Sequence, residues 1–110
     1  IRVGKRFFAN FHFTVLDEAM VTIGDDVFIG PNVSIYTACH STNPIERNTR
    51  QEWARPVTIG NNCWIGGSVT ILPGIRIGNN CTIGAGSVVT SDIPDNTIAV
   101  GNPCRVIKKI

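Results

Sequence analysis

The stretch from Ile59 to Pro94 repeats every six residues, and this repeat constrains the fold more than any other feature of the sequence. Written in blocks it reads IGNNCW, IGGSVT, ILPGIR, IGNNCT, IGAGSV and VTSDIP, with an aliphatic residue at the head of each block. A fixed short period of this kind predicts a solenoid, because it matches neither a helix nor a long alternating strand. The fifth place of each block also looks inward, and it holds Cys63, Val69, Ile75, Cys81, Ser87 and Ile93.

A block of six residues has room for one short strand and one corner. If three blocks close a turn, residues of successive turns stack at the strand spacing of about 4.8 Å. Corners need backbone angles that Gly and Asn tolerate best, and pairs such as Asn61-Asn62 and Asn79-Asn80 fall there. The sequence therefore predicts a core of three aliphatic ladders, with Ile59 under Ile77, Ile65 under Ile83 and Ile71 under Val89.

The same period extends toward the N-terminus through two less regular turns. Residues 3–20 form a degenerate first turn in which Phe7 and Phe13 take the fifth places, and Val21-Thr22 then adds two residues to the count. We expect the second turn to end at His40, and a long polar loop to leave the coil over residues 41–55, where the repeat vanishes. Two more turns follow, and the tail from Asp95 is expected to cap the open end. The prediction is one domain, 1–110, of about four turns.

Six motifs give this pattern a family resemblance. They are FFANF at 7–11, VLD at 15–17, VTIGDDVFIGPNVSIYTACH at 21–40, PVTIGNNCWIGG at 56–67, IGAGSVVTSDIP at 83–94 and GNPCRVIKKI at 101–110. Together they resemble the left-handed parallel β-helix acyltransferases built from hexapeptide repeats, in particular the maltose, galactoside and nodulation O-acetyltransferases. The resemblance implies an all-β triangular prism, acetyl-coenzyme A as co-substrate, and a homotrimer with sites between subunits. The left hand comes from the resemblance alone, because a period does not set the sense of a coil.

Composition excludes several other classes of function. A net charge of +2 with 16% charged residues argues against a nucleic-acid surface. No apolar run approaches the roughly 20 residues of a membrane span, and no signal segment precedes the repeats, so we expect a cytoplasmic enzyme. No C-x-x-C pair links the four cysteines, and two histidines are too few for the three-histidine zinc site of a γ-carbonic anhydrase, so no metal is expected. Relatives carry a helical N-terminal segment that has no counterpart here, and we expect the sequence to be a fragment.

The catalytic candidates are His40 and Asn10. An imidazole titrates near neutrality and can take a proton from a hydroxyl that attacks a thioester, although position alone leaves a surface histidine as the alternative. The match of YTACH to the family's YTAxH implies that His40 is the general base; Ser41 stands where the family usually has Pro. The resemblance implies that Asn10 hydrogen-bonds the acceptor or the tetrahedral centre, whereas in isolation it is an ordinary corner residue.

The resemblance assigns the remaining candidates to the two substrates. For the acceptor they are Asp17, His12, Glu52 and Trp53. The alternative for Asp17 is a cap on the bulge at Val21, for His12 a merely exposed side chain, and for Glu52 and Trp53 solvated loop positions. Trp64 ends its block and should point outward, and the N–H of Gly67 is expected to bond the thioester oxygen. Ser91 replaces a common Lys, which puts one phosphate contact in doubt. The full set for coenzyme A is Trp64, Gly67, Ala85, Thr90, Ser91, Arg105 and Lys108.

The leading prediction is an acetyl-coenzyme A dependent O-acetyltransferase acting on a hydroxyl of a sugar or glycoside. Direct attack with a histidine base needs no Ser or Cys nucleophile. Two alternatives stay open at this point. One is an acetyltransferase for another acceptor, such as an antibiotic or an amino sugar, and the other is a non-catalytic β-helix module that only trimerises.

Overall fold

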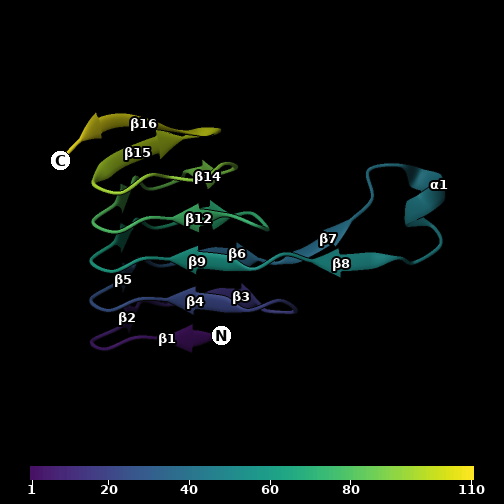
Figure 1. The fold of residues 1–110 in the computed structure, drawn as a ribbon, viewed down its shortest axis with the longest axis horizontal. Helices are drawn as coiled ribbons and strands as arrows, with labels where there is room; N and C mark the ends of the chain where they lie inside the picture. Colours follow the sequence, from purple (N-terminus) through teal and green to yellow (C-terminus); the bar gives the residue numbers. More distant parts are fainter.

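The computed structural model describes all residues 1–110 and shows a three-sided coil of short strands (Figure 1). Each full turn adds one strand to each of three parallel sheets, and the turns stack from the N-terminus at one end to the C-terminus at the other. The chain is a left-handed parallel β-helix in the form of a triangular prism, as predicted. Its single helix has four residues and is not long and apolar enough to cross a membrane.

Up to residue 89 the strands of the three sheets follow one another in rotation along the chain, with one interruption at residues 38–54. The first sheet contains β1 (Arg2–Val3), β4 (Val21–Ile23), β9 (Val57–Ile59) and β12 (Arg76–Ile77). The second contains β2 (Phe8–Ala9), β5 (Phe28–Ile29), β10 (Trp64–Ile65), β13 (Thr82–Ile83), β15 (Thr97–Gly101) and β16 (Cys104–Lys109). The third contains β3 (Thr14–Leu16), β6 (Ser34–Tyr36), β11 (Thr70–Ile71) and β14 (Val88–Val89).

The aliphatic ladders of the core have the predicted register. Ile59 pairs with Ile77, Ile65 with Ile83 and Ile71 with Val89. These side chains are almost wholly buried, as stacking in a closed prism requires. Phe7 and Phe13 of the first turn pack against this core and are partly exposed.

A ladder of side-chain oxygens holds one corner of the prism together. The Oδ1 atoms of Asp25, Asn61, Asn79 and Asp95 each accept a backbone N–H from the turn below, at 2.7 to 2.8 Å. Gly60 must lack a side chain here, because a Cβ atom would lie 2.8 Å from the carbonyl carbon of Gly78 and 2.9 Å from the nitrogen of Asn79. Asn62 and Asn80, the next residues at this corner, adopt left-handed angles with φ of 58°. The predicted corner role of the Asn pairs is confirmed.

Asn79→Ala should destabilise the coil through this ladder. The change removes the Oδ1 atom that accepts the N–H of Asn61 at 2.8 Å, and one lost hydrogen bond is worth about 1 kcal/mol of unfolding free energy. The melting temperature should fall by roughly 4 °C. Circular dichroism melts of this variant and of Gln51→Ala, an exposed polar residue in the loop, measure the difference. Equal melting of the two variants would show that the ladder contributes nothing.

The excursion begins earlier than the sequence predicts. The chain leaves the prism after Thr37, whose buried hydroxyl donates to the Leu16 carbonyl and whose own carbonyl accepts the N–H of Arg55 at 2.9 Å. Strands β7 (Ala38–His40) and β8 (Glu52–Ala54) then pair antiparallel and carry α1 (Pro44–Arg47) at their tip (Figure 1). The predicted start at residue 41 was therefore wrong, because residues 38–40 bond to β8 instead of to a neighbouring turn. Cys39 falls on a fifth place when the six-residue count is continued through the second turn, which predicts an inward side chain, but it is only half-buried.

The C-terminal tail closes one end of the prism, as predicted. Strand β15 continues the second sheet in parallel with β13, and β16 folds back on it antiparallel. Cys104 at the start of β16 is buried, and so are Cys63 and Cys81. Burial raises the pKa of the Cys63 thiol to about 11, so this thiol stays protonated near neutral pH.

Candidate active site

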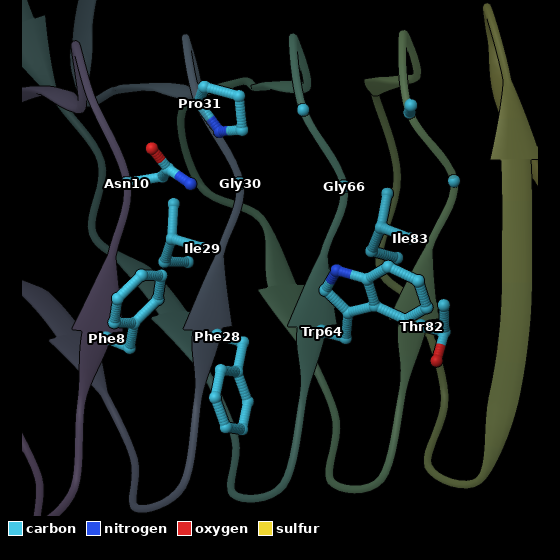
Figure 2. Close-up of a pocket in the computed structure, with 13 residues that line it drawn as sticks. Phe8, Asn10, Phe28, Ile29, Gly30, Pro31, Trp64, Gly66, Thr82 and Ile83 are labelled. Carbon is cyan, nitrogen blue, oxygen red and sulfur yellow. The ribbon is translucent and has the colours of Figure 1, made fainter.

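A groove of about 450 Å³ lies on the outer face of the second sheet. Its floor is a row of side chains that each precede a block head, namely Phe8, Phe28, Trp64 and Thr82. Figure 2 shows them side by side on neighbouring strands. The Phe8 and Phe28 rings lie 6.1 Å apart between centroids. Because successive strand residues face opposite sides, the register that buries the ladder also places this row outside.

Three of these aromatic side chains are more than half exposed. The exposed fractions are 52% for Phe8, 56% for Phe28 and 60% for Trp64. The outward direction predicted for Trp64 is therefore confirmed. A contiguous apolar strip of this size on a small domain indicates a surface that a ligand or another protein covers.

Hydrogen-bond donors lie beside the aromatic row, where the strands end. Asn10 uses its Oδ1 to accept the N–H of Phe11 at 2.8 Å, which leaves its amide nitrogen free to donate (Figure 2). The N–H of Gly66 is used, since it donates to the Ile83 carbonyl at 2.8 Å, but that of Gly67 has no acceptor within the chain. The groove thus offers two unused donors, from Asn10 and Gly67, next to an apolar floor.

His40 lies in a second cavity, on the hairpin. It stands directly across from Glu52 in the antiparallel pair of β7 and β8, with the His40 Nε2 and Glu52 Oε2 atoms 3.6 Å apart. The cavity measures about 390 Å³ and is completed by Arg47, Asn48 and Arg50, so that no apolar residue lines it. A carboxylate facing an imidazole can orient the ring and stabilise the imidazolium that forms when it takes a proton.

The structure distributes the predicted site residues over these two cavities and other surfaces. Asn10, Trp64, Gly67 and Ala85 share the groove, and His40 shares the hairpin cavity with Glu52. Within one chain, then, His40 and Asn10 line different cavities. The other predicted residues line neither cavity. Asp17 binds the Ile1 amino group at 2.8 Å, and His12 lies at a corner with φ of 59°. Trp53 lies on β8, Thr90 and Ser91 follow β14, and Arg105 and Lys108 lie on β16.

Sequence reasoning missed residues in both cavities. Phe28 and Thr82 line the groove because they hold the same block position as Trp64, and this shared position is the signal that identifies them. Pro31 joins them from the next corner. Arg47, Asn48 and Arg50 have no such signal, because they lie on the excursion, where the repeat is interrupted.

Two family models match parts of the chain. The family described as bacterial transferase hexapeptide (six repeats) matches residues 56–91, and the hexapeptide repeat of succinyl-transferase matches residues 20–38. The galactoside O-acetyltransferase of Escherichia coli K12 is 50% identical over 110 residues, which are 100% of this chain and 54% of that protein. The chain thus spans about half the length of the curated relatives it matches.

Two solved structures are similar over nearly the whole chain. A maltose O-acetyltransferase from Clostridium difficile 630 is 60% identical with a TM-score of 0.97, and the match covers 98% of this chain and 58% of that one. A galactoside acetyltransferase in complex with coenzyme A is 50% identical with a TM-score of 0.96, covering 98% of this chain and 54% of that one.

Proposed function

Because this chain belongs to the bacterial transferase hexapeptide family, alongside the galactoside and maltose O-acetyltransferases, we propose that it forms the coiled domain of an enzyme that acetylates a hydroxyl of a sugar or glycoside. Acetyl-coenzyme A is the acetyl donor. The observation that carries this proposal is the alignment of the whole chain with galactoside O-acetyltransferase, together with its likeness to the structure that contains coenzyme A.

His40 acts as the general base in this proposal. It takes the proton of the acceptor hydroxyl as that oxygen attacks the carbonyl carbon of the acetyl thioester. Glu52, at 3.6 Å, holds the ring and stabilises the imidazolium. When the tetrahedral intermediate collapses, the carbon–sulfur bond breaks and the thiolate of coenzyme A receives the proton from His40. The acetyl group is then an ester on the acceptor.

Asn10 and Gly67 supply the donors for the negative charge that develops on the carbonyl oxygen. Both have an unused N–H at the groove, so they do not have to break a hydrogen bond when the charge appears. The apolar floor beside them suits the thioester arm, with Trp64 and Ala85 along its course. Thr90, Ser91, Arg105 and Lys108 extend the cofactor path beyond the groove, where the two basic side chains offer charge to the phosphates.

A homotrimer brings the two halves of this site together. His40 and Asn10 line different cavities of one chain, and the hairpin that carries His40 extends well beyond the prism (Figure 1). We propose that the hairpin of one subunit lies over the groove of its neighbour, with three sites around a threefold axis. The exposed strip of Phe8, Phe28 and Trp64 supports this arrangement, since a subunit contact would cover it.

Light scattering of the full-length protein should therefore give the mass of three chains. Phe28→Glu should shift the mass toward the monomer, because a carboxylate on the apolar strip remains unpaired in the contact. Thr22→Glu is the matched control, since Thr22 is exposed on the first sheet, away from the strip. A parent protein that is monomeric at micromolar concentration would contradict the trimer.

Release of coenzyme A tests the function itself. The full-length protein is incubated with acetyl-coenzyme A and a panel of galactosides, maltose, amino sugars and aminoglycoside antibiotics, and free thiol is measured over time. We expect turnover that depends on a sugar acceptor. Turnover only with the antibiotics or amino sugars would move the proposal to another acceptor class. Absence of release with every acceptor would leave a structural module that only trimerises.

A further inference from the structure

Two arginines of the hairpin cavity have no carboxylate partner. Arg47 makes one long hydrogen bond, from Nη1 to the Ser41 carbonyl at 3.5 Å, and Arg50 makes no side-chain hydrogen bond or ion pair. Arg6, by contrast, binds both oxygens of Asp26 through its Nε and Nη2 atoms. Glu52 is the only acidic residue of the cavity, and it faces His40. The cavity thus holds two positive charges against one negative charge.

The backbone fixes the two arginines one turn apart. The Oδ1 of Asn43 caps α1 by accepting the N–H of Ile45 at 2.9 Å, and the N–H of Arg47 donates to the Asn43 carbonyl at 2.8 Å. The N–H of Arg50 in turn donates to the Arg47 carbonyl at 3.0 Å. Arg50 itself adopts φ of 67°, an angle that few non-glycine residues adopt. The chain therefore holds a long basic side chain at a position that glycine would fill with less strain.

The lining of the cavity favours a charged occupant. Ligand sites for neutral molecules usually combine apolar or aromatic surface with a few polar groups, whereas this cavity has no apolar residue. Guanidinium groups bind carboxylate and phosphate oxygens through paired N–H donors, and such charge-assisted hydrogen bonds are stronger than neutral ones. The free groups of Arg47 and Arg50 fit this chemistry, and they line the same cavity as His40.

We propose that the acceptor is an anionic sugar, whose carboxylate or phosphate binds Arg47 and Arg50 while a nearby hydroxyl faces His40. This inference rests on the proposed function, because it names the acceptor class of the same site. Arg47 and Arg50 are specificity residues in it, and they take no part in bond formation. A neutral sugar keeps the hydroxyl that reacts but lacks the group that the two guanidinium groups bind.

The test compares matched acceptors with the full-length enzyme. The kcat/KM for coenzyme A release is measured with galactose, galactose 1-phosphate and galacturonate. These acceptors compare the neutral sugar with a phosphate that leaves the C6 hydroxyl free and with a carboxylate that replaces it. We expect one of the anionic arms to exceed galactose by about 10-fold or more, through KM. Arg50→Gln should remove most of this advantage and Arg50→Lys should restore part of it.

Arg76→Gln is the control, because Arg76 is exposed on β12, outside both cavities, and it should leave the preference unchanged. Circular dichroism of each variant verifies that the hairpin changes leave the coil folded. Equal kcat/KM for all three acceptors, or an anionic preference that survives both Arg47→Gln and Arg50→Gln, would overturn the inference and leave the proposed function standing. Absence of release with every acceptor would refute both.

Discussion

Replacing His40 with alanine should lower turnover by about 10² to 10⁴, the usual contribution of a positioned general base. The fold and the affinity for acetyl-coenzyme A should stay nearly unchanged, because His40 is exposed on the hairpin and Glu52 is its only ion-pair partner. The measurement is thiol release from acetyl-coenzyme A at saturating acceptor, with binding of coenzyme A followed separately by calorimetry.

The pH profile separates loss of the base from loss of structure. An imidazole base is active only when it is unprotonated, so turnover of the parent should fall in acid. This acid limb should disappear in His40→Ala, whose residual rate depends on hydroxide. Glu52→Gln keeps the shape of the pair but removes its charge, and it should reduce turnover less than the loss of the imidazole does. If His40→Ala kept more than about a tenth of parental turnover, His40 would have no role as the base.

Ile83→Asp should abolish folding. Ile83 is fully buried and stacks between Ile65 and Ala99 in the second sheet, so the new carboxylate has neither water nor a cation near it. Burying an unpaired charge costs several kcal/mol, against a total stability of about 5 to 15 kcal/mol for a domain of ordinary size. We expect insoluble protein, or soluble protein without the cooperative melt that circular dichroism detects in the parent.

Thr82→Asp is the matched control for this change. Thr82 is the preceding residue of the same strand, but its side chain lies on the outer face of the coil, outside the aliphatic ladder. The variant should fold and melt cooperatively. If Ile83→Asp melted like the parent, or if Thr82→Asp alone failed to fold, the assignment of inner and outer faces would be reversed.

The ladders could be predicted from the sequence because a single spacing determines them. Once Ile59, Ile65 and Ile71 are recognised as block heads, their partners one turn later follow by counting, and the structure pairs them in that way. The corner Asn residues follow from the same count. The sense of the coil does not, since both hands share one period, and it was taken from the family resemblance.

The candidate site was less predictable, because it depends on contacts outside the repeat. Cys39 follows the six-residue count, yet it belongs to a hairpin strand and pairs with Trp53. The direct opposition of His40 and Glu52 arises from an antiparallel register that no periodic pattern encodes. The two unpaired arginines next to them likewise depend on the turn that follows α1. The motif that identified His40 says nothing of these neighbours.

The hairpin does not change the register of the six-residue repeat on either side of it. Asp25 and Asn61, which are bonded across the turn that carries the hairpin, are 36 residues apart, whereas Asn61 and Asn79 in the next turn are 18 apart. The hairpin therefore adds residues without adding height to the prism, since the chain returns at Arg55 to the point that it left at Thr37. We therefore expect that a hairpin of another length and composition can be grafted between these two anchors without redesign of the core.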